Sequence, residues 1–349
     1  HRHSSAASDV YKRQFKNLFE KIMERKYKVL VFGATGFTGK LCAKYLKENY
    51  PDLSWAIAGR NEDKLKQVKM ELDLDCDMLI ADANNYEELR DIAKTTKVLL
   101  TTAGPYAKYG SLLMKACVFE NTHYVDITGE NHWVKKQMDL YHEEAVARGV
   151  RIIPSCGYDS LPSDLGTLFA INKMNKAVKK VEVFHSAFGG ASGGTIESIF
   201  TMGRLPKEMR DPFLLNPKGS VSELQRESSK DSIKIKWIDE AKKWSGLGLF
   251  AVANTRVVRR SAALMEMSQK PYGANFTFKE HGAYSSKSAA RLATFGLIAA
   301  FLIISTPLKH LVRRFLPKPG EGPSKEIQEK GWFKGCLLYT SDAADECLC

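Results

Sequence analysis

The sequence has little cysteine and contains no short motif with the spacing of zinc ligands. Seven cysteines are spread over 349 residues, and no two of them form a CxxC pair. This distribution gives no zinc-ligand spacing and indicates reduced thiols in a cytosol-facing protein. Aromatic RNA-binding motifs are also missing, so we expect no nucleic-acid partner. The formal net charge of +12 fits a phosphate-rich ligand or an anionic membrane face better.

The two ends of the chain do not resemble the rest of the sequence and are related to each other at the level of DNA. With suitable codons, the DNA strand complementary to the one encoding residues 4–14, read in another frame, encodes residues 336–346. We therefore expect residues 1–14 and 336–349 to be adapter-derived, with 1–14 disordered and the natural C-terminus truncated. Residues 15–26 form a short charged lead-in without a long apolar stretch, so no signal peptide is expected.

Short apolar runs alternate with helix-length segments between Lys28 and Ser155, a pattern typical of a parallel α/β sheet. Six predicted strands are enough for a complete doubly wound Rossmann sheet at 27–160. A second domain is expected at 161–290, in which residues 205–236 form a long mobile connection. The strands of the first sheet are expected at Val29–Phe32, Trp55–Ala58, Met78–Ala81, Val98–Thr101, Tyr124–Ile127 and Arg151–Ile153, and those of the second domain at Val181–Ser186, Gly248–Val258 and Ala274–Phe278.

The most hydrophobic part of the chain is the uncharged run Leu292–Leu308, within an expected helix at 291–315. A membrane span needs about 20 apolar residues, so a short span, an interfacial helix and a buried core or dimer helix all remain open. Basic residues at 309–314 follow it and fit a cytoplasmic membrane leaflet. A tail rich in proline and glycine is expected at 316–335.

A glycine-rich turn lies directly between the first predicted strand and the helix that follows it. The turn reads Gly33-Ala34-Thr35-Gly36-Phe37-Thr38-Gly39. A dinucleotide's pyrophosphate needs backbone N–H donors at a helix N-terminus, and glycine removes the side-chain bulk that would block it. The GxxGxxG spacing in this context predicts dinucleotide binding, against the alternative of a purely structural turn.

The second strand is followed by Arg60, with Lys64 one helical turn further along. At this position an acidic residue bonds the ribose 2′-OH of NAD, whereas an arginine accommodates the 2′-phosphate of NADP. We therefore expect NADP(H). The alternatives are a solvated surface charge at Arg60 and a role for Glu62 and Asp63, which also suit a helix start.

Two later turns are expected to complete the cofactor site. Asp82 follows the third strand, where it lies near the adenine or caps the next helix. The turn Ala103-Gly104-Pro105-Tyr106 follows the fourth strand, at the carboxyl edge where ligands bind in open α/β sheets. It is expected to line the nicotinamide ribose, unless it serves only as a tight turn.

The sixth strand is followed by Cys156-Gly157-Tyr158-Asp159-Ser160, which brings polar groups to the same edge. The catalytic candidates are Tyr158 as proton donor, Asp159 as an orienting group and Cys156 as nucleophile. Structural roles compete with each of them, among them a buried thiol and a helix cap. No catalytic residue is assigned, because hydride transfer needs only a well-placed cofactor in a dry pocket.

Taken in order, these motifs resemble the saccharopine dehydrogenase-like oxidoreductases, in particular the eukaryotic lipid-droplet-associated branch and the bacterial trans-acting enoyl reductases. The resemblance covers residues 15–335, and it implies a Rossmann domain, a second α+β domain with a mixed sheet, and an NADP-linked reductase. Besides the turns above, it rests on Tyr109-Gly110, Asp126-Ile127-Thr128-Gly129-Glu130, Gly193-Gly194-Thr195 and Leu316-Pro317-Lys318-Pro319-Gly320-Glu321-Gly322-Pro323.

Together with the apolar segment, the resemblance implies an enzyme that reduces an acyl or enoyl group of a lipidic substrate. We expect this enzyme to face the cytosol and to lie at a membrane or lipid droplet. Two alternatives keep the fold: a non-catalytic NADP-binding scaffold on the membrane, and an amino-acid dehydrogenase of the saccharopine type. We expect no metal, and a homodimer is left open. Substrate identity and the direction of hydride transfer do not follow from the sequence.

Overall fold

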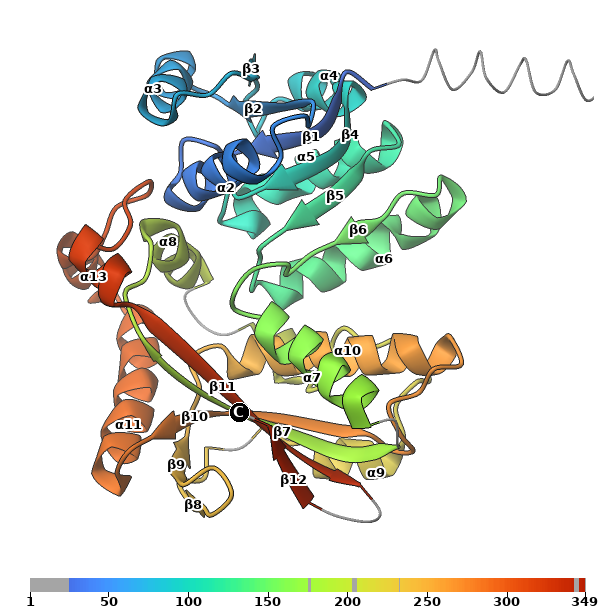
Figure 1. The fold of residues 1–349 in the computed structure, drawn as a ribbon, viewed down its shortest axis with the longest axis vertical. Coiled ribbons are helices and arrows are strands. Elements are labelled where there is room, and N and C mark those ends of the chain that lie inside the picture. Colours follow the sequence, from blue (N-terminus) through green and yellow to red (C-terminus); the bar gives the residue numbers. More distant parts are fainter. Residues whose placement is uncertain (1–24, 175–176, 203–205, 232, 342–344, 349) are drawn as a thin grey trace, which may run out of the picture.

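The computed structural model describes residues 25–174, 177–202, 206–231, 233–341 and 345–348. The expectations for residues 1–14, and for all but the end of 15–26, therefore lie outside the described residues. The described chain forms two lobes, each built around a six-stranded sheet (Figure 1).

The N-terminal lobe is a doubly wound parallel sheet with strand order β3-β2-β1-β4-β5-β6. All neighbouring strands are parallel. The predicted Rossmann sheet is thus confirmed, and each predicted strand boundary lies within two residues of the observed one. The elements are β1 (Tyr27–Phe32), α2 (Phe37–Asn49), β2 (Trp55–Gly59), α3 (Glu62–Leu72), β3 (Asp77–Ile80), α4 (Tyr86–Thr95), β4 (Thr96–Thr101), α5 (Tyr106–Phe119), β5 (His123–Asp126), α6 (Asn131–Ala147) and β6 (Ile152–Ile153).

Helices cover both faces of this sheet, which is why its strands are unbroken apolar runs in the sequence. Leu30 and Val31 are adjacent on β1 and both fully buried, yet they belong to separate cores. Leu30 lies in the same core as Leu113 of α5 on one face. Val31 lies with Leu65 of α3 on the other face. The period-two alternation of a strand therefore places one neighbour in each core.

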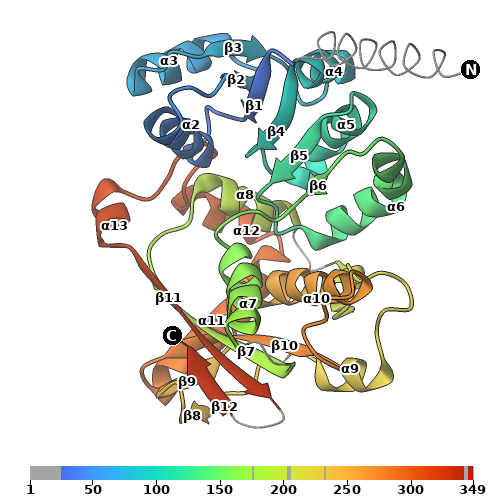
Figure 2. The same ribbon diagram turned by 45° about the vertical axis from the view of Figure 1, so that its right-hand side comes forward.

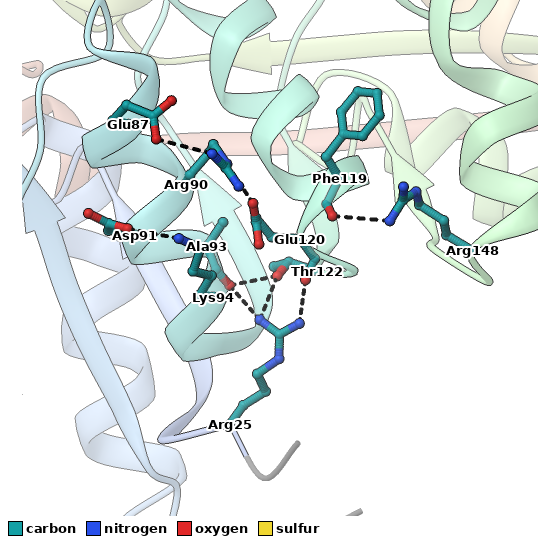
Figure 3. A network of polar contacts seen from close by, with 10 residues as sticks. All are labelled: Arg25, Glu87, Arg90, Asp91, Ala93, Lys94, Phe119, Glu120, Thr122 and Arg148. Carbon is teal, nitrogen blue, oxygen red and sulfur yellow. Dashed lines mark hydrogen bonds and ion pairs between the residues drawn. The ribbon is translucent and has the colours of Figure 1, made fainter. Parts of the chain in front are cut away.

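Arginine side chains fasten the C-terminal ends of α4 and α5 (Figure 3). Arg25 donates to the carbonyl of Ala93 at 2.8 Å and also to the carbonyl of Glu120. Arg90 donates to the Glu120 carboxylate at 2.6 Å. The last carbonyls of a helix have no partner within the helix, and the helix dipole favours cations there. These contacts stabilise the sheet at the edge away from the glycine turn.

The C-terminal lobe contains a mixed sheet with strand order β12-β11-β7-β10-β9-β8. Its central strands β7 and β10 are parallel, and the remaining pairs are antiparallel. The predicted second domain with a mixed sheet is confirmed. Its elements are α7 (Leu161–Met174), β7 (Val178–Phe188), α8 (Gly193–Met202), η1 (Lys207–Arg210), α9 (Glu223–Ser228), β8 (Trp237–Ile238), β9 (Lys243–Gly246), α10 (Ala251–Met267), β10 (Thr277–Tyr284), α11 (Lys287–Ile304), α12 (Lys309–Val312), η2 (Arg313–Phe315), α13 (Lys325–Lys330), β11 (Trp332–Ser341) and β12 (Asp345–Leu348).

Helices α7 and α10 lie between the mixed sheet and the Rossmann lobe in both views (Figures 1 and 2). They bury Ile171 and Val258 in one core with Val181 of β7 and Phe278 of β10. This layer of two helices carries the residues through which the second lobe meets the carboxyl edge of the Rossmann sheet.

The predicted strand at Gly248–Val258 is wrong, because the chain is helical from Ala251 onward. Its first residues are apolar and read like a buried strand, a case in which hydrophobicity alone does not separate strand from helix. In the structure, Thr255, Val258 and Ala263 are buried on one face of this helix. Their spacing is helical, but their hydrophobicity alone does not reveal it. The strand predicted at Ala274–Phe278 overlaps the start of β10, which begins at Thr277.

The predicted mobile connection at 205–236 contains a segment that is fixed to α10 by three arginines. Arg256, which is fully buried, donates to the carbonyls of Met209 at 2.8 Å and Asp211 at 3.2 Å. The other two arginines continue the pattern along the same helix: Arg259 donates to the Pro212 carbonyl and Arg260 to the Leu215 carbonyl. The backbone acceptors of an irregular segment are thus satisfied by side chains distant in sequence.

The predicted Pro/Gly-rich tail at 316–335 includes α13 and the first residues of β11. The expected adapter-derived residues from Cys336 to Ser341 complete β11, which pairs with β7 along its length. The origin of these residues is a question of nucleotide sequence, so it stays a prediction.

The turn at Lys318–Gly322 crosses from the second lobe to the glycine turn of the first. The N–H of Gly193, at the start of α8, donates to the Glu321 carbonyl at 2.8 Å. A Cβ atom at Gly322 would lie 2.1 Å from the ring of Phe37. The ring therefore lies directly against the Gly322 backbone. Only glycine allows this approach.

Within the described residues, α11 is the one helix that is long and apolar enough to cross a membrane by length and composition. It comprises 18 residues and is mostly exposed. Its N-terminal half packs on the mixed sheet, where Thr294 accepts a hydrogen bond from the N–H of Leu247 at 3.0 Å.

Candidate cofactor and substrate site

The glycine turn and the Ala103–Tyr106 turn meet where the strand order of the Rossmann sheet reverses. Strands β1 and β4 are neighbours, and the Thr102 N–H donates to the Phe32 carbonyl at 3.0 Å. Gly33 has a φ of +85°, and a Cβ there would lie 3.0 Å from the Ala103 nitrogen. Ligands of open α/β sheets bind at this switch point. Two segments that the sequence analysis assigned to one cofactor are therefore brought together.

The glycine turn leaves the N-terminus of α2 open to an anion. A Cβ at Gly39 would lie 2.3 Å from the Gly33 carbonyl oxygen, so the turn closes onto the first residues of the helix. The N-cap residue Gly36 makes no side-chain capping bond. Free N–H groups and the positive end of the helix dipole suit a pyrophosphate. This cradle of backbone atoms fits the dinucleotide that the turn predicts.

Arg60 lies exposed after β2, with no carboxylate within ion-pair distance among the described residues. The neighbouring acids have other partners: Glu62 pairs with Lys66 at 2.7 Å, and Asp63 stands in the first turn of α3. Asn61 caps this helix by accepting the N–H of Lys64 at 2.8 Å. The acids are thus helix-start residues, and the guanidinium remains available for a 2′-phosphate.

Asp82 has a local structural partner. Its Oδ1 accepts the backbone N–H of Asn84 at 2.8 Å, forming a turn before α4. The helix itself is capped by Asn85, so the alternative of Asp82 as the cap is wrong. The expected placement of Asp82 near the adenine stays a prediction.

Glu130, which the sequence marked only as the last residue of a family motif, lies beside the cofactor turn. It is 2% exposed, and its two carboxylate oxygens accept the N–H groups of Tyr106 and Ala107, each at 2.9 Å. A carboxylate at a helix N-terminus is stabilised by the dipole, so Glu130 anchors the start of α5 beside the cofactor turn. No local pattern announces this role, because its partners precede it by more than twenty residues.

Asp126, at the end of β5, ties together the turns that follow β5 and β6. Its Oδ1 accepts the N–H groups of Thr128 and Ser155, each at 2.9 Å, and its Oδ2 accepts the Tyr124 hydroxyl at 2.9 Å. Complete burial raises the pKa of Asp126 to about 6, although the three hydrogen bonds oppose that rise. Asp126 therefore shapes the edge from which Asp159 projects.

A cavity of about 160 Å³ lies between the two lobes at this edge. Its walls include Thr38 and Gly104 from the predicted cofactor turns and Thr195 from α8. Apolar side chains close it from the second lobe, namely Leu249, Phe250, Val252 and Phe301. No lysine, arginine or histidine of the described chain lines this cavity.

The three catalytic candidates separate in the structure. Asp159 lines the interlobe cavity, whereas Cys156 and Tyr158 do not. Tyr158 is 54% exposed and packs on the ring of Phe333 in β11, with ring centroids 4.9 Å apart. Burial raises the pKa of the Cys156 thiol to about 11, which disfavours the thiolate required of a nucleophile. Of the three candidates, Asp159 is therefore the one that the structure places at the interlobe cavity.

A buried polar network from the second lobe holds the Asp159 backbone. Asn254 of α10, 1% exposed, donates from Nδ2 to the Asp159 carbonyl at 2.6 Å and to the Glu280 carboxylate at 2.9 Å. Ser160 donates to Asn254 Oδ1 at 2.9 Å. Asn254 and Glu280 are not predictable as site residues, because nothing near them in sequence marks them as partners of residue 159.

The described residues contain no group of three or more histidine, cysteine, aspartate or glutamate side chains arranged to hold a metal ion. The four cysteines before the expected adapter segment, Cys42, Cys76, Cys117 and Cys156, are all free thiols.

Comparison with known proteins agrees with this geometry. Residues 29–153 match the family described as the saccharopine dehydrogenase NADP binding domain. The chain is 34% identical over 338 residues to a putative trans-acting enoyl reductase of Mycobacterium tuberculosis H37Rv, covering 89% of this chain and 80% of that protein. It is 31% identical over 346 residues to a trans-acting enoyl reductase of Mycobacterium ulcerans, covering 91% and 82%.

Among solved structures, the chain is similar to apo saccharopine dehydrogenase (L-Glu forming) from Saccharomyces cerevisiae, with a TM-score of 0.48 and 12% identity over 92% of this chain and 84% of that one. The residues at the switch point fit NADP(H), as the family match requires. The chain therefore belongs to the saccharopine dehydrogenase-like family that includes the trans-acting enoyl reductases, and it is an NADP-dependent oxidoreductase.

Proposed function

We propose that this oxidoreductase uses NADPH to reduce an acyl or enoyl group of a lipidic substrate. The observation that carries the proposal is the interlobe cavity, whose wall from the second lobe includes Leu249, Phe250 and Phe301 and which no cationic residue of the described chain lines. The relatives named trans-acting enoyl reductases support the enoyl group as the reacting part.

The charge of the cavity argues against an amino-acid substrate. A saccharopine-type molecule carries several carboxylates, and a buried carboxylate needs a cation or several hydrogen-bond donors to offset the loss of water. The charged groups that line the cavity are Glu130 and Asp159, which are acids. A neutral acyl chain enters such a space without an unpaired charge.

The residues divide the chemistry as follows. Bound NADPH supplies the hydride. Gly33, Gly36 and Gly39 would hold its pyrophosphate with backbone atoms, and the turn at Gly104 would lie beside its nicotinamide. Phe250 and Phe301, which line the cavity, would shield the reacting carbons from water and so strengthen electrostatic interactions there.

The reaction is tested by incubating the protein with NADPH and either a 2-enoyl thioester or saccharopine-type amino-acid substrates. We expect loss of NADPH absorbance with the enoyl thioester, more strongly for a long acyl chain than for a crotonyl group, because more apolar surface is buried. Turnover confined to the soluble amino acids would overturn the proposed substrate class.

Replacing Arg60 with alanine is expected to reduce the preference for NADPH over NADH by about 10-fold to 100-fold. The guanidinium would form charge-assisted hydrogen bonds to the 2′-phosphate, each contributing about 1.5–3 kcal/mol. The measurement is the dissociation constant for each cofactor by fluorescence titration. Lys66→Ala is the matched control, because Lys66 is an exposed cation on α3 that already pairs with Glu62. An unchanged preference in Arg60→Ala would contradict the assignment.

We further propose that the enzyme works at a membrane or lipid-droplet surface through α11. The outward side of this helix presents Leu292, Phe295 and Leu302, which are 78%, 63% and 64% exposed. Basic residues follow at Lys309 and Arg314. An apolar face flanked by cations suits an interfacial helix on anionic lipids.

The packing of α11 favours an interfacial position over a membrane span. Its 18 residues extend about 27 Å at 1.5 Å per residue, short of the roughly 30 Å hydrocarbon core. A span would also release the contacts of Ala290 and Thr294 with the mixed sheet. Phe301 on the same helix lines the cavity, so an interfacial α11 would bring the site close to the lipid.

The surface proposal predicts that Phe295→Asp combined with Leu302→Asp will lower binding to phosphatidylserine-containing vesicles at least about tenfold. A charged side chain inserted into the apolar boundary costs about 2.5–3.5 kcal/mol at the centre of a bilayer and less near its surface. Vesicle flotation measures the bound fraction. Met70→Asp is the control, because Met70 is 76% exposed on α3, away from α11. Equal flotation of the double variant and the wild type would reject this surface.

A further inference from the structure

We propose that Asp159 is the proton donor of the reduction, acting on a carbon of the substrate's double bond inside the interlobe cavity. This inference rests on the proposed function and assigns the acid that such a reduction needs. Three observations support it. Asp159 lies on the cavity wall, the other titratable side chains on that wall form hydrogen bonds to the backbone, and a polar network fixes the backbone of Asp159.

The titratable side chains that line the cavity are Tyr106, Glu130 and Asp159. The Tyr106 hydroxyl donates to the Thr101 carbonyl at 3.1 Å, and burial raises the pKa of Tyr106 well above its usual value. Both oxygens of Glu130 accept backbone N–H groups of α5. Each of these two groups is committed to the scaffold. Among the described residues, no hydrogen bond or ion pair engages the Asp159 carboxyl, so Asp159 is the acid of this wall that remains available.

The backbone of Asp159 is held more firmly than its side chain. Asn254 donates to its carbonyl at 2.6 Å and, through the same amide nitrogen, to Glu280 at 2.9 Å. Glu280 in turn accepts the Ser163 hydroxyl at 2.6 Å, and that hydroxyl lies 2.8 Å from His185 Nε2. This network fixes the main chain of the turn that carries Asp159 at the wall of the cavity.

The surroundings of Asp159 favour its protonated form. Burial raises its pKa to about 6, and the negative charge of Glu280 on β10 adds to the rise. The other titratable groups around it are Glu130, Tyr106, the adjacent Tyr158 and His185, whose Nε2 lies 3.6 Å from the Glu280 carboxylate. A protonated His185 would offset part of the Glu280 charge, so burial is the main cause of the rise. A carboxylic acid with a pKa near the working pH is suited to deliver a proton and to recover it.

The step balances with the groups already named. The hydride from NADPH bonds to the carbon remote from the thioester carbonyl, and the electron pair of the double bond moves to the carbon beside that carbonyl. The Asp159 O–H bond breaks and the proton bonds to this second carbon. The carboxylate that remains takes a proton from water when the product leaves. One C=C bond is reduced, and one NADPH and one proton are consumed.

Asp159→Asn tests the assignment, because it keeps the shape of the side chain and removes the acidic proton. We expect kcat with an enoyl thioester to fall about 10²-fold to 10⁴-fold and NADPH affinity to change less than about twofold. In the wild type, kcat/KM should be constant below about pH 6 and fall tenfold per pH unit above it, since the acid form is required. The Asn variant should lose that dependence, and Asp159→Glu should recover part of the rate.

Asp164→Asn is the matched control. Burial also raises the pKa of Asp164 to about 6, but this carboxyl lines a different cavity, together with Ser261 and Leu264 of α10. We expect this variant to keep the wild-type rate and pH dependence. A wild-type rate and pH profile in Asp159→Asn would overturn the proposal.

A readout that needs no turnover separates this inference from the proposed function. Carboxyl ¹³C NMR, with the Asp159 signal assigned by loss in the Asn variant, gives the titration of Asp159 in the NADP⁺ complex. Titration near pH 6 or above supports an available acid, and an ordinary value near 4 overturns the proposal. If the wild type does not turn over enoyl thioesters, the substrate proposal fails while the titration still decides whether Asp159 is an available acid.

Discussion

Gly39→Ala will weaken NADPH binding at least about 100-fold and destabilise the Rossmann lobe. The added Cβ would lie 2.3 Å from the Gly33 carbonyl oxygen and 2.8 Å from the Cα of Ala34. Both are backbone atoms, so the turn itself must move by close to 1 Å, and misplacement on this scale costs about 10²-fold in a well-ordered site. Overpacking of this kind costs about 1–3 kcal/mol of folding free energy.

The two effects are measured by fluorescence titration with NADPH and by urea denaturation. Gly296→Ala is the control, because a Cβ at this position in α11 meets nothing within 4 Å. That variant should bind NADPH normally and gain about 0.5–1 kcal/mol from higher helix propensity. Normal NADPH affinity in Gly39→Ala would show that the turn is not the pyrophosphate cradle.

Arg256→Met will lower the free energy of unfolding by about 3–5 kcal/mol, the range for removing one partner from a buried ion pair. Arg256 is fully buried, and its Nη1 lies 2.6 Å from the Asp231 carboxylate. Its loss also leaves the Met209 and Asp211 carbonyls without their donor. Methionine fills part of the volume but satisfies none of these acceptors.

Urea denaturation of Arg256→Met is compared with that of Arg226→Ala. Arg226 is 57% exposed and lies 3.8 Å from Asp211, so its removal should cost no more than about 1 kcal/mol. Met209 lines the interlobe cavity, so Arg256→Met should also raise KM for the acyl substrate. A loss below about 1 kcal/mol would show that the segment from Met209 to Leu215 does not depend on this arginine.

The sequence predicted most of the Rossmann lobe, because each strand of a parallel sheet is covered on both faces and forms a short apolar run. The glycine turn and the turn at Gly104 were predictable for a similar reason. Their conformations require particular residues, such as Gly33 with its positive φ. The residue types of the two turns therefore predicted their conformations. The order of the strands in the sheet then placed the two turns side by side.

The remainder of the site depends on contacts between residues distant in sequence. Glu130 reaches back to the start of α5, and Asn254 holds the turn at Asp159 from a helix that was predicted as a strand. An asparagine among apolar residues has no local signature of a backbone partner nearly a hundred positions away. Arg256 likewise has no local signature of its partners. They lie in the segment 205–236, whose content of charge, proline and serine predicted a mobile connection.

The contact between Gly322 and Phe37 has a mechanical consequence. The two lobes are joined by the chain that leads from β6 into α7 and by a shared core, in which Met209 and Leu215 lie with Leu30 of β1. The turn at Lys318–Gly322 adds a contact at the glycine turn. Because Phe37 begins α2 beside the pyrophosphate cradle, the contact with Gly322 must break before the chain can move away from a nucleotide bound there. Exchange of the nucleotide should therefore be slower than exchange of the substrate, and Gly322→Ala should accelerate nucleotide release selectively.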